Sequence, residues 1–326
     1  MVLKSTNKED GLHKMLVFEE PTIDMFVFID RIPQRGSDIL GRDLFSLPGG
    51  AINISVTAQR LGLSVTIASY IGNDPFEPVI RKTMKEESID DTLVETRDGR
   101  TTTCITLVDK DGERTFITIP GIGKKIEPSF LNKINIDKFD IIYVSGYSLS
   151  IDPIRTTTLQ LVELAANENK VIAFDPGTAV EYVDKAIIDK IIDKTDILFL
   201  NNREAFKLSG YNLLDLAGNA LRREEKIVVI KMGPQGCAIF SDDLIKKFPA
   251  FKVNVVDTTG AGDAFNAAFL YCYEKTNNLE LCGIFSNLVG ALAVTKKGAG
   301  RNLPTKREIV SEIEKLKLDQ LKQLFM

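Results

Sequence analysis

The stretch Asp257-Thr258-Thr259-Gly260-Ala261-Gly262-Asp263 places two glycines and an alanine between polar residues. Such a turn has almost no side chains, so an anion can approach the backbone N–H groups. The alternating valines before it predict a strand over 248–256, and the alanine-rich, apolar residues 264–271 predict a buried helix. The free N–H groups at the start of that helix, with about half a positive charge from the helix dipole, would bind a phosphate.

Asp263 lies at the start of the same predicted helix, where a carboxylate repels a phosphate. A carboxylate beside an anion site suggests a general base, which takes a proton from the group that attacks the phosphorus. The alternative is an ordinary Asp N-cap, which satisfies helix N–H groups and does no chemistry.

The composition limits the classes of function. The chain has 326 residues and a formal net charge of −4, which fits a globular enzyme and argues against non-specific nucleic-acid binding. There is no apolar run of about 18 residues that would predict a membrane span, and no signal-peptide core. The four cysteines lack zinc spacing, so reduced thiols and a cytoplasmic location are expected. The single histidine, His13, is expected in a polar leader (1–14), which disfavours Ser–His and Cys–His catalysis.

Predicted strands alternate with predicted helices from residue 139 onward. Strands are expected at 140–145, 170–175, 196–200 and 226–231, with helices at 155–167, 186–194 and from Glu204. These units predict an α/β fold whose mostly parallel central sheet carries helices on both faces. Ligands bind at the carboxyl ends of such strands, where Asp175, Asn201, Glu204 and Asp263 fall.

The first part of the chain adds a smaller β structure. Residues 25–47 predict ribbons outside the main core, and 101–119 predict a hairpin with an Asp-Gly turn. Together they predict a small sheet that serves as a lid or as a dimer clasp. The C-terminal residues 305–326 predict an amphipathic helix.

Two further motifs fit a nucleotide site. Gly233 and Gly236 follow Lys231 at the end of a predicted strand, which allows a nucleotide to lie against the backbone, although a plain turn is equally consistent. Glu204, three residues after Asn201, fits either a favourable charge at a helix start or a ligand of hydrated Mg²⁺.

A third group of residues fits an acceptor with hydroxyl groups. Gly49 and Gly50 lead into a predicted helix with Asn53, a combination that suits close donors and acceptors for a sugar; a loop followed by an Asn N-cap is the alternative. Asp24 and Asp257 add carboxylates, which accept hydroxyl hydrogen bonds well.

Together these motifs resemble those of the ribokinase-like, or PfkB, carbohydrate kinases, from about Leu16 to about Glu314. The resemblance implies a ribokinase-like domain over 15–318, with a β lid inserted as 25–47 and 98–122. It implies Asp263 as the base and Gly260, Ala261 and Gly262 as the anion hole. It also implies ATP-binding roles for Asn201, Glu204, Lys231, Gly233, Gly236 and Asn287.

The resemblance also implies metal ions. Glu204 would hold Mg²⁺ through water, and many members of the family bind a monovalent cation such as K⁺. By position, the ligands of that cation, mostly backbone carbonyl groups, would come from Asp257, Thr259, Ala293, Lys296, Gly298 and Asn302.

Three departures from the family pattern fall on the acceptor side. Glu19 stands where the first strand usually ends in glycine, and Glu77 stands where a glycine is common. Counting back from Asn53 puts Pro48 and Gly49 in the two glycine positions of the first signature.

The sequence therefore predicts an ATP-dependent kinase that phosphorylates a hydroxymethyl group of a small sugar. A nucleoside kinase would need an apolar slot, for which Phe26, Phe28 and Phe116 are candidates. A sugar-phosphate kinase would need a basic clamp, for which Arg35, Arg42 and Arg114 are candidates. A non-catalytic sugar-sensing module is the alternative of another class. The expected partners are sugar and ATP, with a homodimer through the β lid and neither nucleic acid nor membrane.

Overall fold

The computed structural model describes residues 13–111 and 113–325. Residues 1–12 of the predicted leader therefore lie outside the described part. His13 is not a tail residue: its carbonyl oxygen accepts a hydrogen bond from the Ser64 N–H at 3.0 Å, and its ring pairs with Glu274.

The central sheet has nine strands in the order β13-β12-β11-β10-β9-β8-β1-β4-β5. Their bounds are β1 (Lys14–Phe18), β4 (Ser64–Gly72), β5 (Asp90–Arg97), β8 (Ile141–Ser145), β9 (Val171–Asp175), β10 (Ile197–Asn201), β11 (Ile227–Lys231), β12 (Cys237–Phe240) and β13 (Ile245–Phe248). All neighbours pair in parallel except β11 with β12 and β12 with β13. The predicted α/β fold with a mostly parallel sheet is confirmed.

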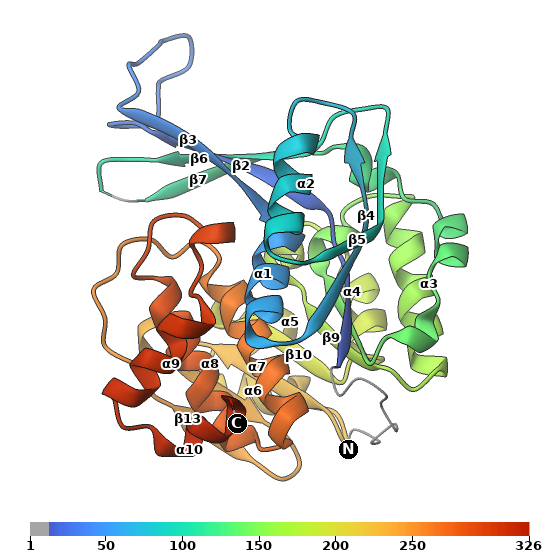
Figure 1. The fold of residues 1–326 in the computed structure, drawn as a ribbon, viewed down its shortest axis with the longest axis vertical. Helices are drawn as coiled ribbons and strands as arrows, with labels where there is room; N and C mark the ends of the chain where they lie inside the picture. Colours follow the sequence, from blue (N-terminus) through green and yellow to red (C-terminus); the bar gives the residue numbers. More distant parts are fainter. Residues whose placement is uncertain (1–12, 112, 326) are drawn as a thin grey trace.

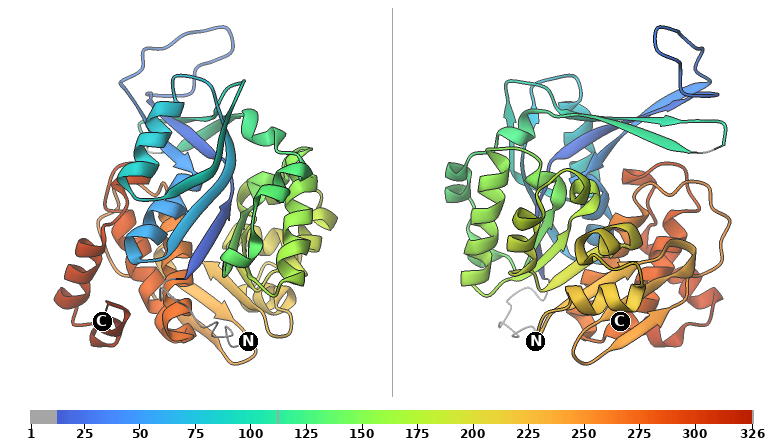
Figure 2. Two further views of the ribbon diagram at one scale, coloured as in Figure 1. Left: turned by 45° about the vertical axis from the view of Figure 1, so that its right-hand side comes forward. Right: turned by 180° about the vertical axis from the view of Figure 1, so that it is seen from behind.

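Helices cover both faces of this sheet (Figures 1 and 2). Their bounds are α1 (Ala51–Leu61), α2 (Glu77–Glu86), α3 (Ile154–Asn167), α4 (Lys185–Ile192), α5 (Asn202–Ser209), α6 (Leu214–Leu221), α7 (Ala261–Thr276), α8 (Leu279–Ala293), α9 (Lys306–Lys315) and α10 (Asp319–Lys322). Successive residues of a strand point to opposite faces, so Met15 and Val17 enter one core with α1, α7 and α8. Leu16 and Phe18 enter the other core, with α3 to α6.

The second sheet, called the small sheet below, consists of β3 (Asp43–Gly50), β2 (Pro21–Phe28), β6 (Thr102–Val108) and β7 (Arg114–Ile119) in that order. It stands apart from the main body (Figures 1 and 2). Because Gly50 ends β3 and Ala51 begins α1, the small sheet feeds directly into a core helix.

Two predicted elements are wrong. Residues 249–260 form no strand, and Val255 is 64% exposed. The backbone N–H groups of Val256 and Asp257 donate instead to the carbonyl oxygen of Val294, at 2.8 and 3.2 Å. The predicted C-terminal helix is two helices, because Lys317 between them has a left-handed backbone with φ of 54°.

Candidate active site

The glycine-rich turn, residues 257–263, leads into α7 as the sequence predicts. Gly260 is the N-cap of α7 with φ of 72°, and a Cβ there would lie 2.7 Å from Cβ of Ala299, so only glycine fits. Asp263 is the third residue of the helix and not its cap, which excludes the N-cap alternative. No side chain caps α7, while the Ala261 N–H donates to the Thr258 carbonyl at 3.3 Å. The N–H groups of Gly262 and Asp263 remain at the open end of the helix.

Asp263 lies in an acidic, buried environment. Burial and the charge of Asp175 raise the pKa of Asp263 to about 7, against the opposing effects of Lys231 and a hydrogen bond with Asn53. A pKa near neutrality suits a general base, because the group is ionised and still holds a proton well. The side chain therefore has the chemistry expected of a base.

A partly buried polar network joins the ends of β9 and β11 and the middle of β8 to α7. Lys231 at the end of β11 donates to Asp175 Oδ2 at 2.7 Å and to Asn266 Oδ1 at 3.1 Å. The Asn266 amide donates to Asp175 Oδ2 at 2.6 Å and to the Tyr143 hydroxyl at 3.3 Å. A Cβ on Gly262 would lie 3.4 Å from Lys231 Nζ, which places this ammonium group beside the open helix start.

Sequence reasoning missed two members of this network, Asn266 and Tyr143. Asn266 is one helical turn after Asp263, and this i, i+3 spacing was the available signal. Tyr143 sits inside an apolar strand, where nothing in the sequence separates it from a core residue.

Asn201 and Glu204 form a capping box at the start of α5. The Asn201 side chain accepts from the Glu204 N–H at 2.9 Å, and the Glu204 carboxylate accepts from the Asn201 N–H at 2.7 Å. Burial and the charge of Asp175 raise the pKa of Glu204. Asn201 and Glu204 thus cap α5, and the Glu204 carboxyl group also lies close to the Asp175–Lys231 pair.

The predicted nucleotide residues lie on two neighbouring segments. Gly233 has open space around its α-carbon, whereas a Cβ on Gly236 would lie 1.9 Å from the Phe248 carbonyl oxygen. The Asn287 amide donates to the carbonyl oxygens of Phe248 and Pro249 at 3.0 and 3.2 Å. Asn287 therefore holds the chain after β13 in place.

The acceptor candidates come together at the junction of β2, β3 and α1. A Cβ on Gly49 would lie 2.1 Å from Asp24 Oδ2, so the carboxylate rests on the glycine backbone. Gly50 has φ of 57°, and its Cβ would lie 2.4 Å from the Glu20 carbonyl oxygen. The two positions that require glycine are thus Gly49 and Gly50, not Pro48.

Asn53 connects this junction to the base. It is the third residue of α1, whose N-cap is Gly50, so the Asn N-cap alternative is wrong. Its Oδ1 accepts from the Gly300 N–H at 3.0 Å, and its side chain also bonds to Asp263.

Glu19, the residue in the usual glycine position, lies close enough to Asp263 for their charges to interact. Burial and the charge of Asp263 raise the pKa of Glu19 well above its usual range, while Ser145 and Lys124 oppose the shift. Burial raises the pKa of Asp24 to about 6. The acceptor side is therefore rich in carboxyl groups.

Of the three arginines considered as a phosphate clamp, Arg42 and Arg114 are already paired, whereas Arg35 is exposed and has no ion pair among the described residues. Arg42 pairs with Asp30 at 3.2 Å and donates to the Ile29 carbonyl, and Lys124 pairs with Glu20. Arg114 from β7 pairs with Asp257 at 2.5 Å.

Asp257 has both carboxylate oxygens occupied. Oδ1 accepts from the N–H and hydroxyl of Thr259 at 2.8 and 2.7 Å and from Arg114, while Oδ2 accepts from the Gly298 N–H at 2.9 Å. Burial would raise the pKa of Asp257, but the bonds from Thr259 and Gly298 and the charge of Arg114 lower it. The ligand set predicted for a monovalent cation thus has a guanidinium group at its only carboxylate and does not fit a further cation.

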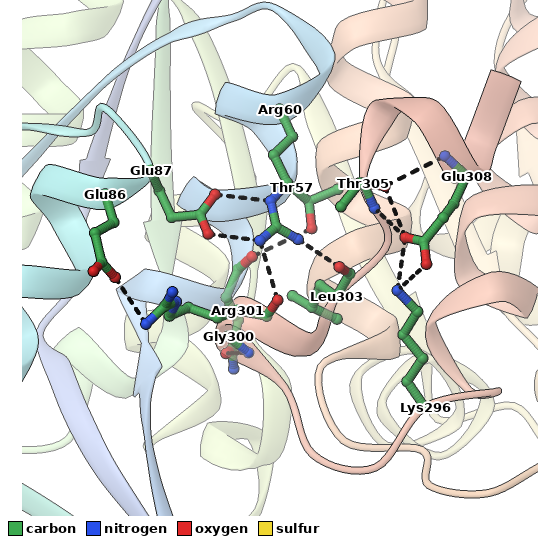
Figure 3. A network of polar contacts seen from close by, with 11 residues as sticks. Thr57, Arg60, Glu86, Glu87, Lys296, Gly300, Arg301, Leu303, Thr305 and Glu308 are labelled. Carbon is green, nitrogen blue, oxygen red and sulfur yellow. Dashed lines mark hydrogen bonds and ion pairs between the residues drawn. The ribbon is translucent and has the colours of Figure 1, made fainter.

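The 293–302 loop, which carries the other predicted cation ligands, is braced from outside (Figure 3). Arg60 of α1 donates to the carbonyl oxygens of Leu303 and Arg301 at 2.5 and 3.0 Å and pairs with Glu87. Lys296 pairs with Glu308, which also closes the capping box of α9 with Thr305.

Magnesium fits the site only in company with phosphate. Among residues 13–111 and 113–325, no three His, Cys, Asp or Glu side chains come together as a metal-ion cage. Asp175, Glu204 and Asp263 nevertheless all lie near one cation, Lys231, and Arg203 adds a second positive charge near Glu204. Mg²⁺ usually takes one or two carboxylates plus phosphate and water, and this acid-rich end meets that requirement.

The chain was compared with known proteins. The model of the family described as "pfkB family carbohydrate kinase" matches residues 14–306. Fructokinase-1 of Zea mays is 30% identical over 287 residues, covering 82% of this chain and 88% of that protein. A nucleoside kinase of Methanothermobacter thermautotrophicus is 26% identical, covering 91% of this chain and 94% of that protein. A ribokinase structure from Thermotoga maritima aligns with a TM-score of 0.78 at 25% identity, covering 93% of this chain and all of that one (100%).

No helix in the described ranges is both long enough and apolar enough to cross a membrane.

Proposed function

The chain belongs to the pfkB family of carbohydrate kinases and is an ATP-dependent sugar or nucleoside kinase, and we propose that it phosphorylates a hydroxymethyl group of a small sugar. The observation that carries this proposal is the position of Asp263. Its carboxyl group lies on the first turn of α7, beside the open helix start and in contact with Asn53 of the acceptor side. A non-catalytic sensing module is set aside, because the family match supports an enzyme.

Asp263 acts as the general base in this proposal. It takes the hydroxyl proton as the sugar oxygen attacks the γ-phosphorus of ATP in line. The new O–P bond forms as the bond to the bridging oxygen breaks, and ADP leaves. The pKa of about 7 leaves much of Asp263 ionised at neutral pH.

The glycine-rich turn and Lys231 stabilise the charge on the transferring group. This role falls to the backbone N–H groups of Gly260, Ala261 and Gly262, and the helix geometry adds the N–H of Asp263. The Ala261 N–H must release the Thr258 carbonyl oxygen, to which it donates at 3.3 Å, to take part. Donors of this kind are each worth about 10²–10³ in rate. Lys231 Nζ, close to Gly262, supplies a full positive charge at the same point.

The nucleotide lies against Gly233, Gly236 and the segment held by Asn287. Mg²⁺ bound with the nucleotide would neutralise charge on the phosphates. Glu204 would hold that hydrated ion, and Asp175 keeps Lys231 and Asn266 in position. The proposal includes ATP and Mg²⁺ and leaves the monovalent cation out.

The charge of the acceptor side favours a sugar without a phosphate group. Glu19, Asp24 and Asp263 gather there, and Arg42, Arg114 and Lys124 are paired within the chain. A phosphorylated acceptor would meet these carboxyl groups, and in the described ranges Arg35, in the exposed loop between β2 and β3, is the one arginine of the predicted clamp without an ion pair. Asp24, Gly49, Gly50 and Asn53 would contact the sugar, and Asp257 shapes the turn beneath it.

A nucleoside acceptor is the second candidate, and Phe116 favours it. Strand register puts Phe45, Phe26, Thr106 and Phe116 in one row across the small sheet, on the face that carries Asp24. Phe26 stacks on Phe45 with ring centroids 4.7 Å apart, but Phe116 is 60% exposed and free to stack on a base.

We also propose a homodimer through the small sheet. Its other face carries Leu44, which is 65% exposed, and Ile117, which is 50% exposed. Exposed apolar side chains on an open sheet are typical of an interface. Light scattering should give twice the chain mass, and Leu44→Glu should give the monomer.

A coupled ADP-release screen tests the function. Free sugars, nucleosides and sugar phosphates are offered at equal concentration with MgATP. The proposal expects the highest kcat/KM for a free sugar; Phe116→Ala should then cost less than about threefold, whereas loss of a stacked base costs about 10-fold or more. A preference for sugar phosphates would refute the proposed acceptor class.

A further inference from the structure

Arg114 joins the small sheet to the glycine-rich turn. From β7 its guanidinium donates to the hydroxyls of Thr258 and Thr259, both at 3.0 Å, and to Asp257 Oδ1 at 2.5 Å. These three acceptors precede Gly260, the N-cap of α7. One side chain of the small sheet thus holds the segment that sets the geometry of the anion hole.

We propose that Arg114 is a positioning residue that takes the place of a monovalent cation at Asp257, so that turnover needs neither K⁺ nor Na⁺ but does need the small sheet in place. The inference rests on the proposed kinase function. It departs from the cation dependence that the family resemblance implies.

The first argument is charge and space at Asp257. Its four accepted hydrogen bonds come from Arg114, from the N–H and hydroxyl of Thr259, and from the Gly298 N–H. Three of these donors crowd Oδ1, which has two lone pairs, and the fourth meets Oδ2, so Oδ1 has no room for a further ligand. A second cation at the same oxygens would also be repelled by the guanidinium.

The second argument is that the facing loop is held without an ion. Asn302 Nδ2 donates to the Lys297 carbonyl at 2.8 Å, and Gly300 N–H donates to Asn53 at 3.0 Å. Arg60 binds the end of the same loop through the carbonyls of Arg301 and Leu303 (Figure 3). Direct bonds therefore hold the 293–302 loop to itself and to α1, and the Gly298 N–H joins it to Asp257 of the glycine-rich turn.

The third argument is the location of Arg114. It pairs with Val108 at the end of the β6–β7 hairpin, and β7 is an edge strand of the small sheet. The guanidinium reaches Asp257 only while this edge lies over the turn. The anion hole is then fully shaped only when the sheet that carries Asp24 covers the acceptor, which limits ATP hydrolysis by water.

Cation dependence tests the proposal directly. Wild-type initial rates are measured in KCl, NaCl and choline chloride at one ionic strength, with MgATP and the best acceptor from the screen. We expect kcat to agree within about twofold across the three salts. The ionic strength is the same in all three, so screening is equal, and the proposal requires no particular monovalent cation. A fall of tenfold or more in choline that K⁺ restores would overturn the proposal.

Three variants test the role of the side chain. Arg114→Ala should lower kcat about 10–100-fold with a smaller change in KM for ATP, since the anion hole is displaced and not removed. Dilute guanidinium or K⁺ should restore part of the loss, and Arg114→Lys should lie between, because one ammonium group cannot match the planar fork. Arg42→Ala is the matched control, because Arg42 immediately precedes β3 of the same sheet but pairs with Asp30. Wild-type kcat in Arg114→Ala, or an equal loss in Arg42→Ala, would overturn the proposal.

A binding measurement separates this inference from the proposed function. The affinity for a non-hydrolysable ATP analogue with Mg²⁺ is measured by calorimetry in choline and in K⁺. Wild-type affinity should not depend on K⁺, whereas Arg114→Ala should bind more weakly in choline and recover in K⁺. If no tested acceptor were phosphorylated, the proposed function would fail, but this binding result would still test the role of Arg114. K⁺-dependent binding by the wild type would overturn the inference.

Discussion

Two regions of the molecule differ in their polar contacts. One is the carboxyl ends of β9, β10 and β11, and the other is the small sheet. At the strand ends, Asp175, Lys231 and Asn266 are joined by hydrogen bonds of 2.6 to 3.1 Å. The small sheet instead exposes apolar side chains, and its paired glycines let a single carboxylate, Asp24, approach the backbone.

This difference assigns separate tasks to the two regions. A buried, mutually bonded network fixes charges for a reaction that every phosphoryl acceptor shares. An open sheet with few polar contacts can change its side chains at little cost to that network. We therefore expect changes at the strand ends to reduce kcat and changes in the small sheet to alter KM for the acceptor. Arg114 is the exception, because its side chain leaves the small sheet and bonds to the glycine-rich turn.

The largest effect is expected for Asp263→Asn. Asparagine keeps the shape and loses the base, so kcat should fall by about 10³-fold or more, while ATP-analogue affinity stays within about threefold. Steady-state kinetics and calorimetry measure the two quantities. A variant with more than a tenth of wild-type kcat would mean that Asp263 is not the base.

Folding of this variant provides its control. The pKa of Asp263 is raised in the folded chain, so its bound proton stabilises the fold at low pH, and that contribution is lost as the pH rises through about 7. Asp263→Asn should therefore gain Tm relative to wild type on going from about pH 5 to about pH 8. A variant that is destabilised at every pH would make its lost activity uninformative.

Gly49→Ala should give the next largest effect, in the other region. The new methyl group would lie 2.1 Å from Asp24 Oδ2, so the carboxylate must move. We expect KM for the acceptor to rise about 10–100-fold with little change in KM for ATP. Gly41→Ala is the control, because its Cβ would meet only the Phe28 carbonyl at 3.5 Å. An equal change in KM for the acceptor and KM for ATP would contradict the proposal that the small sheet and the strand ends have separate tasks.

The pH profile should show a smaller shift that depends on Lys231. Wild-type kcat/KM should fall about tenfold per pH unit below the Asp263 pKa of about 7. Lys231 lowers that pKa, so Lys231→Met should move the acid limb to higher pH as well as lower the rate. Lys247→Met, which removes a surface lysine paired with Asp215, should leave the limb in place. An unmoved limb in Lys231→Met would contradict the assignment of the limb to Asp263.

Sequence reasoning succeeded where local chemistry and fold agree. The turn from Gly260 to Asp263 and the strand–helix alternation after residue 139 were predicted, because backbone geometry demands glycine and buried strands demand apolar residues. It failed where pairing is non-local. The valines around 255 have the strand period, yet their N–H groups bond to Val294, a partner that no local pattern reveals.

The site was predictable in part for the same reason. Asp263 follows a glycine-rich turn and Lys231 ends a predicted strand, so their positions in the sequence predict a place in the site. Arg114 does not, since an arginine in a hairpin is ordinary until the fold brings it 2.5 Å from Asp257, far along the chain. The register of β3 into α1 also assigned the two required glycines to Gly49 and Gly50, which counting from Asn53 did not.

The smallest effect should separate structure from chemistry within the strand-end region. Asn201 and Thr305 each close a capping box with a glutamate three residues later, so Asn201→Ala and Thr305→Ala should each cost about 1 kcal/mol of unfolding free energy. Thr305 lies on the outer brace of the 293–302 loop, and its loss should leave KM for MgATP unchanged. Asn201 also orients Glu204, so its loss should raise KM for MgATP about threefold to tenfold in addition. If denaturant unfolding and kinetics gave the two variants the same profile, Glu204 would be a cap only, and the magnesium assignment would lose its support.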